Sequence, residues 1–195
     1  MSQPQTRHTP KGASTRDRIL DAARSMLIER GVERLALREL ADSLEIKLGN
    51  LQYYFKTKDA LVLQVMEIEA ERDRTIIKGH VDGRKEPAET LRLIVRDLIT
   101  RWRGDSGVLF STLGTLAIHH ASYRALYRSI YADFYAALEV PIRGLNPGLS
   151  ESELGLRVRM ITALIDGAPM QPQLTSKRVF LKRVQAEAEA IAVRK

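Results

Sequence analysis

The sequence predicts an all-α protein of about nine helices, and three observations support this fold class. Apolar residues recur at the three- and four-residue spacing of a helix along most of the chain. Alternating strand patterns of useful length are absent, as are long β-branched runs. Capping signals and glycine or proline breaks separate the apolar stretches. The chain has 195 residues, of which 44% are hydrophobic, so it is long and apolar enough to bury a core.

The first sixty residues predict a polar arm followed by three helices, two of them short. Residues 1–13 should form a flexible basic arm. Ser14 and Asp17 have the form of a capping box, and Gly31 should end the helix that they open. Isolated helices of about nine residues are marginal, so the two short helices must pack against the first. The inward positions are Ile19, Ala23, Met26 and Leu27 in the first helix, Leu37, Leu40, Ala41 and Leu44 in the second, and Leu48, Leu51 and Phe55 in the third.

The rest of the chain predicts six further helices. A long one should run from about Thr57 to Lys78, followed by a turn-rich break from Gly79 to Pro87. The next helix carries Leu91 to Trp102 and is stopped by Gly104, and the one after it is opened by Ser106. Another starts at Ser122 and runs until Pro141 bends or ends it. After a loop at 144–148, a capping box of Ser150 and Glu153 opens a helix that Gly167 and Pro169 end, and a last helix covers roughly 176–193. We therefore expect an arm at 1–13, a three-helix domain at 14–56 and a larger helical domain at 57–195.

Composition excludes several classes of protein. The chain has no cysteine, which rules out disulfides, thiolate catalysis and Cys-based metal sites. No apolar run approaches the roughly 20 residues that cross a bilayer, and the first residues lack a secretory pattern. We expect a cytoplasmic protein without membrane association. His119 and His120 are neighbours that point about 100° apart on a helix, so they do not share a metal. No P-loop, His-Glu-x-x-His or Ser/His/Asp grouping is visible, so we expect no enzyme, cofactor or metal.

Residues 14–61 carry the functional signal. Three helices, two of them short and joined by a tight turn, are the layout of a helix-turn-helix DNA reader. Asn and Gln pair with adenine edges, and Lys suits guanine or phosphate. The net charge of +7 suits a polyanionic partner, and the segment from Arg7 to Arg18 is locally basic. The outward side of the second short helix carries Lys47, Gly49, Asn50, Gln52, Tyr53 and Tyr54.

The same residues resemble a known family. The run Thr15 to Ala23, the triplet Glu29-Arg30-Gly31 and the run Leu37 to Ala41 are similar to the opening of the TetR/AcrR family of bacterial transcriptional regulators. The run Gly49-Asn50-Leu51-Gln52-Tyr53-Tyr54-Phe55-Lys56-Thr57-Lys58-Asp59-Ala60-Leu61 resembles the family motif most closely. The resemblance implies a ligand-responsive repressor that binds palindromic operator DNA as a homodimer and that a small hydrophobic or cationic inducer releases.

Five positions depart from the family pattern, and one of them is Tyr54, which stands where the family has His. Ala36 and Lys47 stand where Ser or Thr usually cap the second and third helices, and Glu45 stands where the turn usually has Gly. Gln52 occupies the slot of a phosphate-binding Tyr, so phosphate contacts at Ala36 and Gln52 stay open. We expect Lys58 and Tyr54 to contact phosphates and Lys47, Asn50 and Tyr53 to contact base edges.

Two further sites are expected in the second domain. Aromatic and neutral polar residues on its middle helices suit an inducer cavity, although an aromatic stripe is as often ordinary core. The last two helices should pair with their twofold mates as a four-helix bundle, the alternative being intrachain core. The ligand candidates are Trp102, Phe110, Leu113, His120, Tyr127, Tyr131 and Phe134; the dimer candidates are Leu154, Val158, Ile161, Ile165, Phe180 and Val184. Asp166 we interpret as a structural residue at a helix end.

Two other classes of function are weighed against the regulator. One is a small all-helical hydrolase or lyase that uses the histidines, which the absence of a recognisable catalytic motif disfavours. The other is a helical interaction module without a nucleic-acid role, which the match from Asn50 to Lys58 disfavours.

Overall fold

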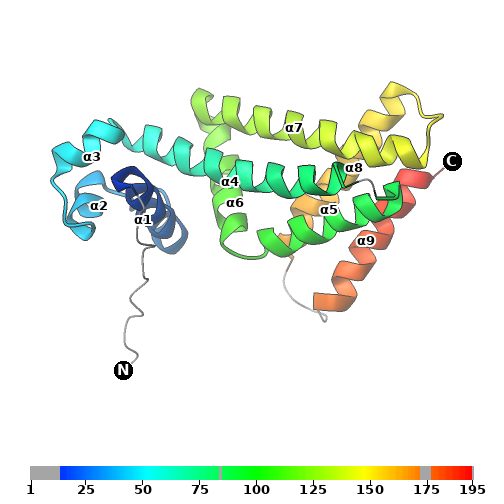
Figure 1. Cartoon of the computed structure of the whole chain (residues 1–195), viewed down its shortest axis with the longest axis horizontal. Helices are drawn as coiled ribbons and strands as arrows, with labels where there is room; N and C mark the ends of the chain where they lie inside the picture. The colour runs from blue at the N-terminus through cyan, green and yellow to red at the C-terminus, as the bar shows by residue number, and fades with distance from the viewer. Residues whose placement is uncertain (1–13, 84, 172–176, 195) are drawn as a thin grey trace. The chain divides into compact units, whose positions relative to one another are not determined.

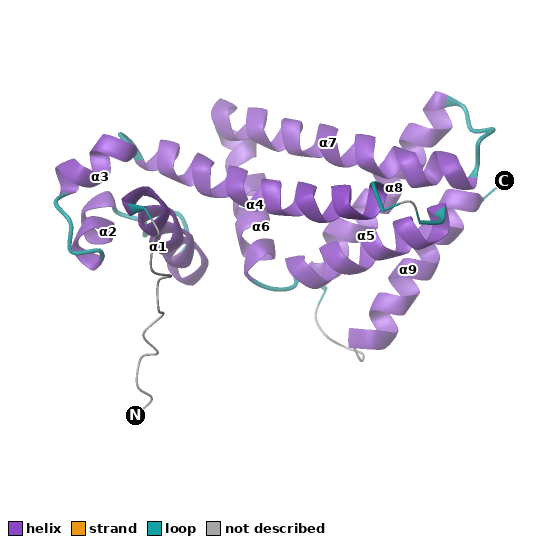
Figure 2. Ribbon diagram, in the orientation of Figure 1, coloured by secondary structure: helices purple, strands orange, loops and turns teal. Residues whose placement is uncertain are grey.

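A computed structural model describes residues 14–83, 85–171 and 177–194. Within them the chain is all-α, as the sequence predicts (Figures 1 and 2). The helices are α1 (Thr15–Arg30), α2 (Leu37–Ser43), α3 (Leu48–Tyr54), α4 (Lys58–Val81), α5 (Pro87–Trp102), α6 (Asp105–His119), α7 (Ala121–Leu145), α8 (Glu151–Gly167), a short 3-10 helix (Ala168–Met170) and α9 (Lys177–Val193). The predicted arm at 1–13 lies outside the described residues.

The chain divides into two compact units, Met1–Met66 and Glu67–Lys195, and α4 contributes residues to both. The predicted boundary between residues 56 and 57 falls at the start of α4 and stays a prediction. Each unit is described by itself below.

The first unit is built as the spacing of its apolar residues predicts. Ser14 accepts a hydrogen bond from the Asp17 amide, Asp17 reaches back to the Ser14 amide, and Gly31 caps the end of α1. The capping box is therefore confirmed. Ile19, Leu40 and Leu51 are fully buried, which joins α1, α2 and α3 around one small core.

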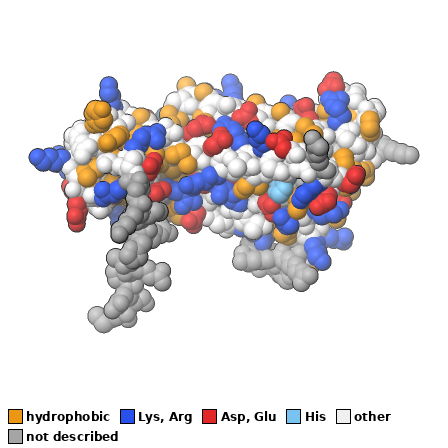
Figure 3. Space-filling model, in the orientation of Figure 1, with side chains coloured by type: hydrophobic (Ala, Val, Ile, Leu, Met, Phe, Trp, Pro, Cys, Tyr) orange, Lys and Arg blue, Asp and Glu red, His pale blue; other side chains and the backbone are white. Residues whose placement is uncertain are grey.

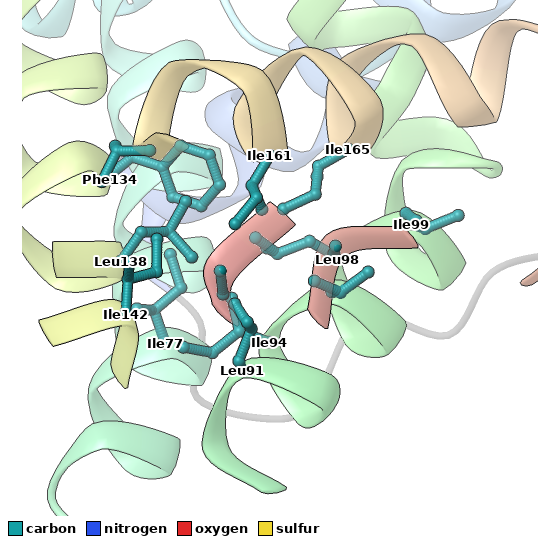
Figure 4. Close-up of a cluster of buried hydrophobic side chains, with 14 of the residues drawn as sticks. Ile77, Leu91, Ile94, Leu98, Ile99, Phe134, Leu138, Ile142, Ile161 and Ile165 are labelled. Atoms are coloured by element: carbon teal, nitrogen blue, oxygen red, sulfur yellow. The ribbon is translucent and has the colours of Figure 1, made fainter. Parts of the chain in front are cut away.

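The second unit has a continuous aliphatic core to which five helices contribute. Figure 4 shows side chains of α4, α5, α7 and α8 pointing toward one another, with α9 running past them. Ile94, Leu98, Leu138, Ile161 and Ile165 are almost completely buried there. Burying each such side chain contributes about 1.5–3 kcal/mol, so this core sets the positions of the polar and aromatic groups around it.

Several predicted boundaries in the second unit are wrong. The helix α4 continues through Gly79 to Val81, so the break is shorter than predicted. Gly104, not Ser106, precedes α6, and Ser106 is buried. Pro141 lies inside α7, which runs on through Gly144. Tertiary packing accounts for this, because Pro141 is buried and the neighbouring Ile142 belongs to the core.

Candidate functional site

The helices α2 and α3 are held on the first unit by their apolar sides. Leu40, Leu51 and Phe55 are buried, and the Arg16 guanidinium lies 5.6 Å from the centre of the Phe55 ring. Arg18 donates a hydrogen bond to the Leu44 carbonyl at the end of α2 (3.3 Å). These contacts fix the inner side of α3 and leave its outer side to solvent.

The turn between α2 and α3 requires a left-handed residue. Glu45 has φ +57°, and it is the one non-glycine residue with positive φ among those described. This conformation costs an L-residue about 1–2 kcal/mol, which is why glycine suits the position. The Ile46 amide donates to the Ala41 carbonyl (3.1 Å) and closes the turn. The tight turn predicted from sequence is therefore present, and the Glu in it adopts the glycine conformation.

The outer side of α3 is polar and accessible. Lys47, Gly49, Asn50, Gln52 and Tyr53 are all exposed, and Tyr53 reaches 81% exposure. Tyr54, 38% exposed, packs its ring edge-on against Tyr53 with the centroids 5.2 Å apart. An exposed tyrosine pair beside amide and ammonium groups offers hydrogen-bond donors and apolar surface on a single helix.

Neither short helix has a side-chain cap. The N-cap residues are Ala36 for α2 and Lys47 for α3, and neither side chain bonds to the helix. The first-turn amides of both helices therefore receive no hydrogen bond from an N-cap side chain. Lys58, the first residue of α4, is half-buried, and its Nζ lies 3.4 Å from the Glu33 carbonyl oxygen. All seven predicted DNA-binding residues lie in the segment 47–58 of the first unit.

The second unit contains a cavity of about 700 Å³ between α4, α5, α6 and α7. Its aromatic wall consists of Trp102, Phe110, Tyr131 and Phe134, four of the seven predicted ligand residues. The rings of Trp102 and Phe110 stack with their centroids 4.6 Å apart. Pockets of this size and lining hold small molecules, so the cavity is the leading candidate ligand site.

Sequence reasoning missed the polar side of this cavity, which α4 supplies. Asp73 is buried and accepts hydrogen bonds from Trp102 Nε1 (2.9 Å) and from Arg101 Nε. Burial raises the pKa of the Asp73 carboxyl, against the lowering effect of Trp102 and Arg101. Glu69, also buried, accepts from Arg101 (2.7 Å) and Ser106 (2.9 Å). The sequence signal for these buried carboxylates was their position, because residues 69 and 73 fall in line with the apolar residues of α4.

Arg74 forms the charged rim of the same cavity. It donates to Asp133 (2.9 Å), Glu67 (2.8 Å) and Glu71 (3.0 Å). Figure 3 shows basic and acidic side chains next to one another over the second unit, on the face in view. The three carboxylates bonded to Arg74 therefore outnumber its single positive charge.

A second, smaller cavity of about 500 Å³ lies between α7 and α8. Tyr127, Tyr131, Tyr135 and Asp166 line it. The Tyr127 hydroxyl donates to the Tyr131 oxygen (3.1 Å), and the Tyr131 hydroxyl donates to Asp166 Oδ2 (2.8 Å). Burial raises the pKa of Asp166 to about 6, which outweighs the lowering effect of the Tyr131 hydrogen bond. Sequence analysis gave Asp166 a structural role at a helix end; the structure places it in this cavity.

Two predicted ligand residues do not reach either cavity. Leu113 is buried in the packing of α6, and His120 is exposed at the junction of α6 and α7, with its ring 5.9 Å from that of Tyr123. His119 is exposed as well. Both histidines are therefore exposed, and neither lines either cavity. Over the described residues, no group of three or more His, Asp or Glu is placed to hold a metal ion.

The predicted dimer residues lie in the interior of a single chain. Leu154, Val158, Ile161, Ile165 and Val184 are buried, and Phe180 is half-buried with Arg103 over its ring (5.3 Å). A side chain that already packs inside its own chain has no surface left for a twofold mate. These residues therefore belong to the core of a single chain and not to a dimer interface, because the apolar stripe of α8 faces α5, α7 and α9.

None of the helices, as far as the structure describes them, combines the length and apolarity that a bilayer span requires. The first unit is a helix-turn-helix domain, since a short helix, a tight left-handed turn and a second short helix with an exposed polar side are what defines that class. Residues 19–65 match the family model described as bacterial regulatory proteins, tetR family. The match covers 47 of the 195 residues, so it is the first unit that resembles this family.

Relatives and solved structures agree with this assignment. The repressor KstR2 of Mycolicibacterium smegmatis is 39% identical over 54 residues, which are 28% of this chain and 26% of that protein. The chain matches less than half the length of its curated relatives. A Rhodococcus transcriptional regulator superposes with TM-score 0.77 at 18% identity, over 91% of this chain and 96% of that one. A regulator from Saccharomonospora viridis, solved with choline, has TM-score 0.72 at 17% identity, over 92% and 96%. The fold is thus shared over nearly the whole chain.

Proposed function

We propose that this protein is a ligand-responsive transcriptional repressor that binds double-stranded, palindromic operator DNA as a homodimer. The observation that carries the proposal is the outer side of α3, where Lys47, Asn50, Gln52 and Tyr53 are exposed together. A helix of this kind enters the major groove, where its amide and ammonium groups meet base edges. The match of residues 19–65 to the tetR family model and the similarity to the repressor KstR2 support the same role, and they favour a regulator over a hydrolase or lyase.

Phosphate contacts would come from the borders of α3. Lys58 begins α4 and carries the ammonium group of this border. Tyr54, partly exposed, adds a hydroxyl on the same segment. Contacts of this kind position a protein on DNA without reading its sequence, whereas Asn50 and Lys47 would supply sequence preference.

Replacing Lys58 with alanine should weaken binding to all duplexes by a similar factor and reduce the salt slope by about 1, because one phosphate contact is lost. Replacing Asn50 with alanine should cost roughly 1–3 kcal/mol at one base position and relax the preference there. The measurement is selection of duplexes from a random pool by the purified protein, followed by fluorescence anisotropy titrations between 50 and 200 mM salt, a range in which phosphate contacts change affinity by orders of magnitude.

Gly49→Ala is a further variant of the same surface, since a Cβ there meets no atom of the chain within 4 Å. It probes how closely α3 approaches DNA without removing a donor. An unchanged salt slope for Lys58→Ala would contradict the phosphate assignment, and unchanged base preference for Asn50→Ala would contradict the base contact.

The cavity lined by Trp102, Phe110 and Phe134 is the proposed inducer site. Its walls are aromatic, and the carboxylates at its rim outnumber the Arg74 that joins them, which suits a hydrophobic or cationic small molecule more than a phosphorylated one. The Saccharomonospora viridis regulator, solved in complex with choline, supports a small-molecule site in this fold. Residues of α4 line the cavity, and the same helix begins at Lys58. A ligand that shifts α4 would therefore shift Lys58, which gives the two sites a physical connection.

For the homodimer we propose the exposed sides of α8 and α9 in place of their buried stripe. Leu156 is 53% exposed and Met160 40%, and the two lie one turn apart on α8. On α9 the exposed residues Ala186, Ala190 and Val193 follow one another at helical spacing. The pair α8 and α9 packs together within the chain, so two such pairs can form a four-helix bundle around a twofold axis.

Glutamate at Leu156 and Met160 together should convert a dimer into a monomer, because four charges would be buried at the twofold interface. Light scattering at micromolar concentration measures this directly. Val140→Glu on α7, where the side chain is 54% exposed, is the control and should leave the dimer intact. A dimer that survives the double substitution, or a wild-type monomer, would exclude this interface. Charged residues at Val158 or Ile161 would not test it, since both lie in the core.

A further inference from the structure

One buried oxygen of the second unit has no donor. Across the described residues, Asp166 Oδ1 is the one buried side-chain oxygen or nitrogen without a hydrogen-bond partner. The other oxygen of the same carboxylate accepts the Tyr131 hydroxyl at 2.8 Å. An acceptor removed from water and left without a donor is costly, and such an atom in a cavity wall marks where a donor binds.

The walls around this oxygen are aromatic and contributed by one side of α7. Tyr127, Tyr131 and Tyr135 follow at four-residue spacing, with ring centroids 4.6 Å and 5.6 Å apart between neighbours. All three line the 500 Å³ cavity together with Asp166. Faces of tyrosine rings attract cations, and a carboxylate among them adds the counter-charge.

The acidic groups of the larger cavity differ from Asp166 in this respect. Asp73 accepts from Arg101 and from Trp102, and Asp133 is bonded to Arg74. Both carboxylates accept a hydrogen bond from an arginine of the chain, although each of these arginines also serves another carboxylate. Asp166 instead has a neutral tyrosine as its hydrogen-bond donor, so one of its oxygens stays open to a donor from a ligand.

We propose that the cavity between α7 and α8 binds a protonated organic amine, with an N–H group of the ammonium donating to Asp166 Oδ1 and the hydrocarbon part lying on the tyrosine rings. The requirement for a donor separates primary, secondary and tertiary ammonium ions from quaternary ones, which carry no N–H. This cavity is distinct from the inducer cavity proposed above, although Tyr131 lines both, and binding to it does not depend on DNA.

Two arginines face the same cavity. Arg159 donates to the Gly155 carbonyl (2.9 Å) and lies 5.2 Å over the Tyr135 ring, while Arg128 projects from α7. Both are exposed, so water screens their charge at the mouth of the cavity, whereas Oδ1 is buried. The titratable groups facing Asp166 are thus these two arginines and the three tyrosines. Protons compete with an amine for the carboxylate, whose pKa is raised to about 6 by burial.

The probe is 2-phenylethylammonium, titrated into the full chain by calorimetry at pH 8. We expect it to bind at least tenfold more tightly than its N,N,N-trimethyl analogue and than neutral 2-phenylethanol. Its affinity should fall about tenfold between pH 8 and pH 5, as the ionised fraction of a carboxyl with a pKa near 6 does. Absence of binding, equal affinity for the trimethyl analogue, or tighter binding of anionic 3-phenylpropionate would overturn the proposal.

Variants assign the site. Asp166→Asn keeps the shape of the side chain and should lower amine affinity at least tenfold and abolish the pH dependence. Glu187→Gln changes the net charge equally at an exposed position of α9 and should bind as the wild type does. Ala163→Leu, at the exposed mouth of the cavity, blocks access without altering Asp166 and decides the matter should Asp166→Asn fail to fold. Wild-type affinity in Asp166→Asn or in Ala163→Leu would place the amine elsewhere.

Discussion

Replacing Arg101 with alanine should lower the free energy of unfolding by about 3–5 kcal/mol, because it leaves the buried Asp73 without its counter-ion and the buried Glu69 with Arg72 alone. Arg101 donates to both Glu69 and Asp73, which are 4% and 6% exposed. Urea denaturation at pH 7 measures the loss. Lowering the pH should reduce the deficit, since protonation neutralises the abandoned carboxyls, and burial already raises the pKa of Asp73.

Arg96→Ala is the matched control on the same helix. Arg96 is about half exposed and pairs with Asp97, so its removal should cost less than about 1 kcal/mol. Adding Asp73→Asn to Arg101→Ala should recover part of the loss, because the amide oxygen can still accept from Trp102 and carries no charge. An Arg101→Ala variant as stable as Arg96→Ala would show that Glu69 and Asp73 do not need the guanidinium.

Replacing Gly107 with alanine should cost about 3 kcal/mol, at the upper end of what overpacking costs. A Cβ there would lie 1.8 Å from the carbonyl oxygen of Trp102 and 2.8 Å from its carbonyl carbon. Because these are backbone atoms, the end of α5 must move, and with it the Trp102 indole that bonds to Asp73 and stacks on Phe110. Denaturation and the emission of Trp102, the single tryptophan of the chain, report both effects.

Gly114→Ala on the same helix is the comparison. Its Cβ would make an ordinary contact of 3.6 Å with the Tyr127 ring. Removing a glycine from a helix interior stabilises it by about 0.5–1 kcal/mol, so this variant should be more stable than the wild type. Equal stability of the two variants would mean that the approach of Gly107 to Trp102 is not tight in solution.

The first unit was predictable from sequence because its signals are local. The capping box at Ser14, the helix end at Gly31 and the apolar spacing of Leu40, Leu51 and Phe55 each act within a few residues. The outward positions on α3 follow from the inward ones, since a helix with one buried side exposes the other. Glu45 in the left-handed turn is where local preference and structure disagree, and the surrounding contacts of α2 and α3 override it.

Helix-end and cap signals gave wrong helix boundaries where contacts between distant helices decide them. Pro141 signals a helix end, yet α7 continues because its neighbours Leu138 and Ile142 are buried in the core. Ser106 signals a cap, yet its hydroxyl donates to Glu69, 37 residues earlier in the chain. An apolar stripe such as Val158 and Ile161 predicts burial without saying against what, and here it packs inside the chain.

The sequence by itself determined the all-α class, the helix-turn-helix unit and which side of α3 faces outward, since helix period, caps and turns are encoded by neighbouring residues. The tertiary structure alone decided which distant side chains meet. It paired Asp73 with Trp102 and Arg101, brought Asp166 beside Tyr131, and separated His120 and Leu113 from both cavities. The physical reason is that such contacts join helices far apart in the chain, and how those helices pack depends on the shape of the whole core, which no short stretch of sequence contains.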